Sequence, residues 1–354
     1  MKKKLFIIGN GFDLAHGVKS DYLYFKKYVY EKAFGTSKEL TNLTGKVDIA
    51  DFLNEKDWED LRVISDFDIS SLPEEYEPDN QEWNQMCYQL LSQTMSDTRT
   101  WSDFEEDIVG LANPEVDFEL VLDREGDVDG FKSESNIEGL GNSLLPLVAA
   151  INSLFVEWIE QTYQEWNECM GSCVEKIKKK AIVSNQDSYY LTFNYTTILE
   201  DLYDIQQENI YHIHGEIGDE IIFGHKGNDT EYDNPLDISY YTDELVLQLK
   251  KPVKEILDRS RTNDFFEKIT EIEEIYFIGV GAIKTDIDDD YPGVDDPYFE
   301  KIFELMQNVD IYVDCYDEKQ RSMIIKKLKK WGAEKADQLQ FVDTSGDIVI
   351  DSKI

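Results

Sequence analysis

Short apolar runs without polar alternation recur along the chain, and they constrain its fold more than any other feature. Typical examples are YYLTF at 189–193 and DIYVDCY at 310–316. A strand that is apolar at nearly every position is buried on both faces, as in a parallel sheet covered by helices. The runs predict strands at 5–8, 189–193, 210–214, 221–223, 275–279, 310–316 and 339–342.

Helical stretches separate several of these runs, notably at 197–205 and 298–308. Alternation of strands and helices is typical of a doubly wound α/β fold. A chain of 354 residues is long enough for one large domain or two. Because residues 21–185 are mostly helical in pattern, we expect them to form an insertion after the first strand. Residues 1–20 and 186–354 would then form the α/β core.

The clearest helix of this insertion is expected to begin after Asn142-Ser143, a favourable N-cap pair, with Pro146 in its first turn. Its apolar stripe keeps helical spacing from Leu144 to Ile177. Cys169 and Cys173 fall within the same helical pattern, so we expect both to pack in the core.

Charge and hydropathy exclude several function classes. Acidic residues outnumber basic ones 74 to 35, and a net charge of −39 repels a nucleic-acid backbone. The basic runs at 176–180 and 326–330 are expected on solvated helix faces or ends. Residues 5–8 are too few for a signal-peptide core, and no run reaches the roughly 18–20 apolar residues of a membrane span. Since the four cysteines also suit a reducing compartment, we expect a cytoplasmic protein without nucleic-acid or membrane partners.

The first strand runs directly into Gly9-Asn10-Gly11. A strand, a glycine turn and the start of a helix can present backbone N–H groups to a phosphate. Glycine lets the backbone approach a ligand closely, so a Cβ at Gly11 is expected to block binding while the sheet stays folded. Leu14 stands where the third glycine of G-x-G-x-x-G belongs. A tight structural turn is the alternative interpretation.

Polar residues follow other predicted strands. The chain has four histidines, all beside candidate strand ends: His16, His212, His214 and His225. Alternation along a strand predicts that His212 and His214 share a face. Next to Gly215, at the carboxyl end of its strand, His214 is in the position where open α/β sheets bind ligands, whereas His212 is better explained by packing. Asn194 follows the strand 189–193 and either contacts a ligand or caps the next helix.

Together, GNGFDLAHG, LTFNYT, YHIHG, FGHKG and IYFIG resemble the AbiH-type bacteriophage abortive-infection family, which is distantly similar to sirtuin-like proteins. The resemblance implies a Rossmann-type fold and an antiphage protein that cleaves the nicotinamide–ribose bond of NAD to deplete it. It implies Asn194 and His214 as the catalytic residues. The implied nucleotide-binding residues are Gly9, Asn10, Gly11, Phe12, Asp13, His225 and Gly279. Asp13 stands where sirtuins usually carry a serine.

The chemistry expected of this site follows from its substrate. The bond breaks through an oxocarbenium-like state with a cationic leaving group, so no strong general acid is needed. His214 would accept a proton from a ribose hydroxyl or from water. Asn194 would orient the water or the ribose, and Asp13 would bind a ribose hydroxyl or balance the cation. No metal is expected.

Two alternatives from other classes stay open. One is a non-catalytic nucleotide sensor that signals through the helical insertion. The other is a metal-dependent hydrolase using His212, His214 and His225 with an aspartate. In TWSDFEEDI, Ser102 and Glu105 match a capping box, although Asp103 or Glu105 is also a candidate carboxylate for the cleft. A homo-oligomer and a phage-derived trigger stay open as partners.

Overall fold

The computed structural model describes residues 2–43, 46–64, 77–94, 101, 104, 130–170, 188–224, 250–284, 293–314 and 318–342. The chain divides into two compact units. The first is formed by Met1–Ser20, Ile159–Ile222 and Pro252–Ile354, and the second by Asp21–Trp158 and Phe223–Lys251. A separate helical insertion over 21–185 stays a prediction.

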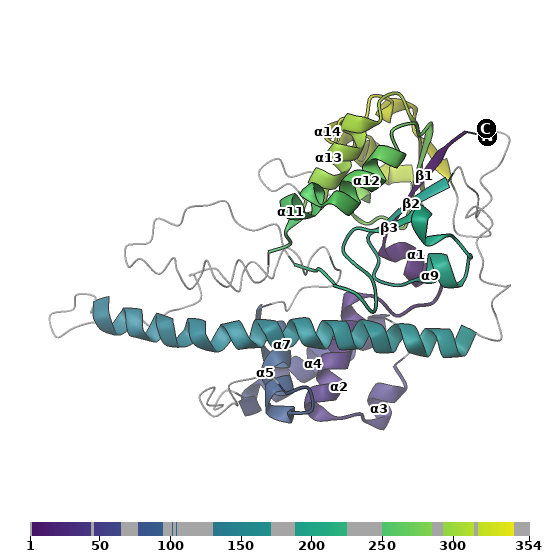
Figure 1. The fold of residues 1–354 in the computed structure, drawn as a ribbon. Coiled ribbons are helices and arrows are strands. Elements are labelled where there is room, and N and C mark those ends of the chain that lie inside the picture. Colours follow the sequence, from purple (N-terminus) through teal and green to yellow (C-terminus); the bar gives the residue numbers. More distant parts are fainter. Residues whose placement is uncertain are drawn as a thin grey trace. The chain divides into compact units, whose positions relative to one another are not determined.

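The first unit contains a sheet whose described strands are all parallel (Figure 1). In chain order these are β1 Lys4–Ile8, β2 Ser188–Thr192, β3 Ile210–His212, β4 Glu274–Ile278, β5 Asp310–Asp314 and β6 Gln340–Val342. Their spatial order is β3-β2-β1-β4-β5-β6, so the direction of strand addition reverses between β1 and β4. The predicted α/β class with a parallel sheet is confirmed. The predicted strand at 221–223 is wrong, because Ile221 makes only an isolated antiparallel bridge to Gly215.

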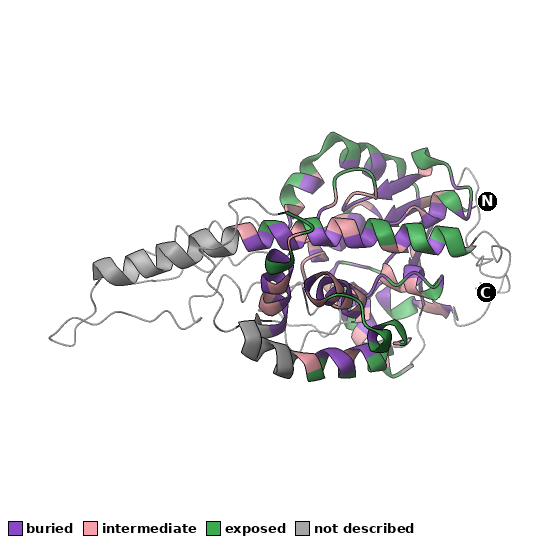
Figure 2. Ribbon diagram, turned by 90° about the horizontal axis from the view of Figure 1, so that it is seen from below, coloured by how far each residue is buried: buried purple, intermediate pink, exposed green. Residues whose placement is uncertain are grey.

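The strands are apolar throughout because both faces of the sheet are covered. Leu5 and Ile7 of β1 belong to the core on one face, and Phe6 and Ile8 to the core on the other. Figure 2 shows the strands coloured as buried. The first face packs against four helices, which lie together in Figure 1: α11 Val253–Asp258, α12 Ser260–Lys268, α13 Asp296–Leu305 and α14 Arg321–Lys330.

The opposite face carries a row of stacked aromatic rings. Phe6 of β1 stacks on Tyr190 of β2 with ring centroids 5.0 Å apart and on Tyr276 of β4 at 4.9 Å. Tyr276 in turn stacks on Tyr312 of β5 at 4.5 Å. Offset-stacked rings in register across neighbouring strands stabilise the sheet beyond the apolar area they bury. This face packs against helices α1 Asn10–Ala15 and α9 Ile198–Asp201 and against the end of helix α7.

A buried ion pair joins α13 to α14. Lys327 Nζ lies 3.2 Å from Asp296 Oδ1, and the same oxygen accepts a hydrogen bond from Trp331 Nε1 at 2.9 Å. Both charged side chains are almost completely buried. The basic run at 326–330 therefore does not lie entirely on a solvated face, because one of its lysines balances a buried carboxylate.

The described part of the second unit is helical. Besides the first part of α7, it contains α2 Tyr22–Phe34, α3 Lys38–Thr41, α4 Lys46–Ile64 and α5 Gln81–Thr94. Asp21 caps α2 by accepting a hydrogen bond from the Leu23 N–H. Aromatic side chains fill the core of this unit, with Phe25, Trp101, Phe155 and Trp158 in mutual ring contact.

Helix α7 spans Gly130–Met170, so the predicted start after Asn142-Ser143 is wrong. Pro146 lies inside the helix, where it removes one backbone hydrogen bond without ending the helix. The predicted apolar stripe is confirmed from Val148 to Trp166, where buried positions recur every three or four residues (Figure 2). Cys169 is exposed rather than packed in the core, and Cys173 lies outside the described residues.

Short 3-10 helices complete the described elements: η3 Gln207–Asn209, η4 Ala282–Lys284, η5 Glu318–Gln320 and η6 Ala336–Gln338. None of the helices in the described ranges combines the length and apolarity needed to cross a membrane.

Candidate functional site

The glycine turn after β1 is packed against the end of β4. Gly9 N–H donates to the carbonyl of Ile278 at 3.0 Å, and Gly11 N–H donates to the carbonyl of Gly279 at 2.9 Å. Gly279 itself has φ +66°, and a Cβ there would lie 2.2 Å from Phe12 N. The N–H groups of Gly9 and Gly11 thus join the two strand ends, and any phosphate near this turn needs other donors.

This packing changes the result expected for substitution of Gly11. An ideal Cβ at Gly11 would lie 2.8 Å from Gly279 Cα, and backbone atoms cannot move away as a flexible side chain can. We therefore expect Gly11→Ala to lower the free energy of unfolding by about 1–3 kcal/mol, as overpacking does elsewhere. Denaturant unfolding measures the loss. Gly281→Ala is the matched control, because an added Cβ there meets no atom within 4 Å. Equal stability of the two variants would contradict the packing argument.

The other predicted residues of this turn have structural partners. Asn10 Nδ2 donates to the carbonyl of Ser20 at 3.0 Å, and Asn10 Oδ1 accepts from Ser20 Oγ at 2.5 Å. Phe12 is buried against the rings of His16 and Tyr203. His16 Nε2 lies 2.7 Å from the hydroxyl of Tyr203, so this histidine has a place in the core.

Asp13 is the centre of a buried polar network at the carboxyl ends of β1 and β2. Its Oδ1 accepts a hydrogen bond from Asn194 Nδ2 at 2.6 Å, and its Oδ2 accepts one from Thr196 Oγ1 at 2.8 Å. Asn194 Nδ2 also donates to the carbonyl of Gly9 at 3.1 Å. All three side chains of this network, Asp13, Asn194 and Thr196, are buried. The predicted residues Asp13 and Asn194 are therefore brought together by direct hydrogen bonds.

Burial raises the pKa of the Asp13 carboxyl to about 7, because a carboxylate is poorly solvated there. The hydrogen bonds from Thr196 and Asn194 and the nearby charge of His212 oppose this shift only in part. A carboxyl group that changes charge near neutral pH is suited to binding or proton transfer.

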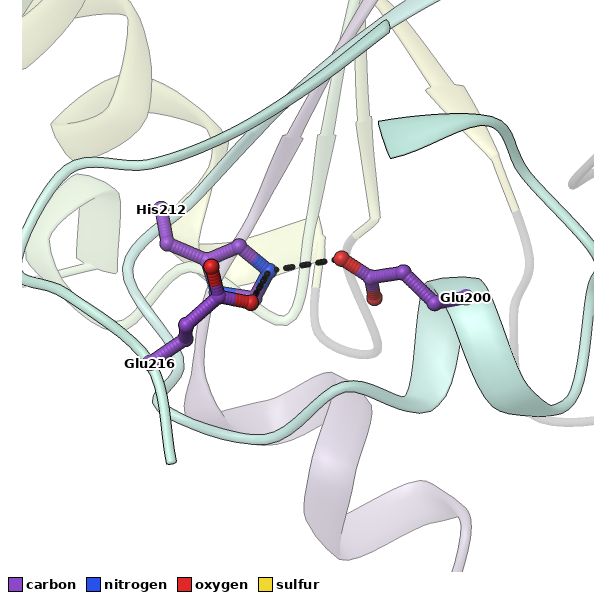
Figure 3. Close-up of side chains that lie close together, drawn as sticks. All are labelled: Glu200, His212 and Glu216. Carbon is purple, nitrogen blue, oxygen red and sulfur yellow. Dashed lines mark hydrogen bonds and ion pairs between the residues drawn. The ribbon is translucent and has the colours of Figure 1, made fainter. Parts of the chain in front are cut away.

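His212 lies beside this network, between two glutamates (Figure 3). Its Nε2 is 3.0 Å from Glu200 Oε1 and 3.7 Å from Glu216 Oε2, and its Nδ1 is 3.1 Å from the carbonyl oxygen of Asn194. Burial disfavours the charged ring, but the hydrogen bond and charge of Glu200, the Asn194 carbonyl and the charge of Glu216 together raise the pKa of His212. Without a bound cation, both ring nitrogens face acceptors, which favours the protonated imidazole.

His214 has different neighbours from His212. Strand β3 ends at His212, and the chain then turns toward Gly215, which has φ +84°. His214 consequently packs against the rings of Phe193 and Tyr298, with its Nε2 3.4 Å from Asp295 Oδ1. The prediction that His212 and His214 share a face is wrong, because the strand is too short for its alternation to reach residue 214. The predicted residues His225, Ser102, Asp103 and Glu105 lie outside the described residues.

The last residue of β5, Asp314, holds the glycine turn after β4 in place. The Gly279 N–H donates to Asp314 Oδ2 at 2.7 Å, and Asp314 Oδ1 lies 3.3 Å from Lys284 Nζ. The glycine turns that follow β1 and β4 are in contact through the hydrogen bond from Gly11 to Gly279, and they lie where the strand order reverses. In open α/β sheets, this reversal is the usual place for a ligand.

Sequence patterns missed four residues of this region: Thr196, Glu200, Glu216 and Asp295. Thr196 is contained in the quoted motif LTFNYT, so its nearness to Asn194 was a usable signal. No comparable signal marks the three acidic residues in a chain with 74 aspartates and glutamates.

Comparison with known proteins adds one result. The protein-family model described as "Bacteriophage abortive infection AbiH" matches residues 5–315, a range that contains Asp13, Asn194 and Thr196 of the polar network and also His212 with its two glutamates. Neither the curated proteins nor the solved structures gave a match. With most of its length covered by this model, the chain belongs to the bacteriophage abortive infection AbiH family.

Proposed function

We propose that this protein acts in abortive infection by binding NAD at the carboxyl ends of β1–β4 and cleaving its nicotinamide–ribose bond. Abortive infection follows from the family. The Rossmann-type fold, NAD and its cleavage come from the distant resemblance of the motifs to sirtuin-like proteins.

The observation that carries the proposal is the buried network of Asp13, Asn194 and Thr196 beside the reversal of strand order. A buried carboxyl with a pKa near 7 is costly for stability, and such groups concentrate at functional sites. The order β3-β2-β1-β4-β5-β6 is also the order of dinucleotide-binding doubly wound sheets.

The roles that we propose for His214, Asn194 and Asp13 follow from the contacts of their side chains. His214 acts as the base, and Asp295, 3.4 Å from its Nε2, orients the ring. Asn194 acts as a positioning residue, because its Nδ2 donates to Asp13 and to the Gly9 carbonyl. Asp13 binds a ribose hydroxyl or balances the positive charge that develops as the bond breaks.

The test is release of nicotinamide and ADP-ribose from NAD by the purified protein, together with NAD content of expressing bacteria after phage challenge. We expect release by the wild type and about a 100-fold lower rate for His214→Ala, the lower end of a general-base contribution. Asp295→Asn is expected to lose less. Asp219→Asn, which changes an exposed aspartate nearby, serves as the matched control.

The outcomes separate the alternatives. The nucleotide sensor would be favoured if NAD protects the protein against thermal unfolding, but the purified protein releases no nicotinamide and infected cells keep their NAD. Absence of both protection and release would reject NAD as the ligand. His214→Ala counts only if its melting temperature stays near that of the wild type.

A further inference from the structure

Glu200, His212 and Glu216 form a cluster of potential metal ligands, called here the His212 cluster (Figure 3). One donor atom from each side chain lies within 4.8 Å of the other two. Glu200 belongs to α9, His212 ends β3, and Glu216 follows the turn after β3. The three residues thus come from separate short segments that the fold brings together.

The orientation of the imidazole is the one found in protein metal sites. Nδ1 faces the backbone carbonyl of Asn194, outside the cluster, at 3.1 Å. Metal-bound histidines commonly donate the N–H of one nitrogen to such a carbonyl, which leaves the lone pair of the other nitrogen for the ion. Here the other nitrogen, Nε2, points between the two carboxylates, and His212 is only 4% exposed.

The oxygens of the two glutamates also suit this arrangement. Glu200 Oε2 is buried and accepts no hydrogen bond from the described part of the chain. Glu216 directs Oε2 toward His212, while its Oε1 lies 3.9 Å from Arg261 at the surface. A buried carboxylate oxygen without a donor is costly, and a cation bound by Glu200 through both Oε1 and Oε2 would remove that cost.

We propose that the His212 cluster binds a divalent transition-metal ion, with Glu200, His212 and Glu216 as its protein ligands. Two ligands about 2.1 Å from a tetrahedral ion lie about 3.4 Å apart. The observed distances from His212 Nε2, 3.0 Å to Glu200 Oε1 and 3.7 Å to Glu216 Oε2, bracket that value. One imidazole and two carboxylates suit Zn²⁺, Mn²⁺ or Fe²⁺, and three protein ligands leave a position open for water or a ligand oxygen.

The proposal differs from the metal-dependent alternative left open by the sequence, which combined His212 with His214, His225 and an aspartate. His214 contacts Asp295 and Tyr298 instead, and His225 is outside the described residues. The inference does not rest on NAD cleavage, since it concerns only whether the ion binds.

The test is titration of chelator-treated full-length protein with Zn²⁺ alone, followed by calorimetry and by NMR of the histidine side chains. Because the chain has only four histidines, the His212 resonances can be assigned with His212→Ala. We expect one tight site per chain and a large shift of the His212 Nε2 resonance. Glu200→Gln and Glu216→Gln should each weaken binding at least about 100-fold, above the 10–100-fold effect of residues that only orient a ligand.

A chain with a net charge of −39 also attracts divalent cations through surface carboxylates. Glu220→Gln, an exposed glutamate paired with Arg259, is the matched control and should keep wild-type affinity. The proposal would be overturned if Glu216→Gln and Glu220→Gln change the affinity for Zn²⁺ equally, or if the His212 resonance is unchanged at saturating Zn²⁺. The cluster would then be an ion pair between a protonated His212 and the glutamates. If Glu200→Gln fails to fold, the Zn²⁺ affinity of the more peripheral Glu216→Gln and the His212 resonance of the wild type still test the proposal.

Discussion

Asp13→Asn should raise the free energy of unfolding at pH 8 by up to about 4 kcal/mol. The ordinary pKa of an aspartate is 3.8, and burial raises that of Asp13 to about 7 in the folded protein. Each unit of this difference corresponds to about 1.4 kcal/mol of folding free energy. Because the folded-state pKa is raised, the contribution of this group to stability is fully present below pH 3.8 and is lost as the pH rises through 7. Asparagine carries no charge at any pH, and its amide can replace the bonds to Asn194 and Thr196.

Denaturant unfolding at several pH values measures this effect. The stability difference between Asp13→Asn and the wild type should grow by about 3 kcal/mol between pH 5 and pH 8. Asp219→Asn provides the control for removing one negative charge at the surface. A difference that does not change with pH would mean that Asp13 has an ordinary pKa. If the wild type cleaves NAD as proposed, a variant that is more stable but inactive would fit a carboxyl kept for function at a cost in stability.

Asp296→Ala should lower the free energy of unfolding by about 3–5 kcal/mol, because it leaves the charge of Lys327 buried without a partner. It also removes the acceptors of Trp331 Nε1 and of the Gly293 N–H. Replacing both charged residues, as in Asp296→Ala combined with Lys327→Met, should recover a large part of the loss, since the uncompensated charge is then absent.

The surface pair of Lys329 and Asp337, whose side chains are 52% and 69% exposed, provides the control. Asp337→Ala should cost at most about 1 kcal/mol. Chemical denaturation of the wild type and the three variants, including the double variant, separates the effect of burying an unpaired charge from the effect of losing an ion pair. If Asp296→Ala lowers the free energy of unfolding no more than Asp337→Ala does, the buried pair of Asp296 and Lys327 does not stabilise the fold.

The sequence predicted the sheet well because its strands are buried on both faces. The runs at 189–193 and 275–279 correspond to β2 at 188–192 and β4 at 274–278, a difference of one residue at each end. Hydrophobicity decides such strands locally, and parallel pairing requires no turn signal between neighbours. The position of Asn194 directly after the strand 189–193 also predicted it as a site residue, whereas Asp13, which lies in α1, was implied only by the family resemblance.

Side chains whose environment depends on distant segments were not predictable in this way. His214 differs from His212 because β3 ends two residues earlier than its apolar pattern suggests. Lys327 is buried because α13 supplies Asp296, 31 residues away in the sequence. Glu200 and Glu216 belong to the His212 cluster through the short turns around β3, which no periodicity describes. In each case the partner, and not the local pattern, determines the role.

The place of β1 in the sheet has a consequence for synthesis of the protein. This strand is made first, but its two neighbours in the sheet are β2 and β4, which end at residues 192 and 278. At about 5–20 residues per second, a ribosome needs roughly 14–56 s to reach the end of β4. Until then the edge of β1 that pairs with β4 is without its partner strand, and the N–H groups of Gly9 and Gly11 lack their acceptors, the carbonyls of Ile278 and Gly279. A chain interrupted before residue 278 therefore cannot form the contact between the glycine turns that follow β1 and β4.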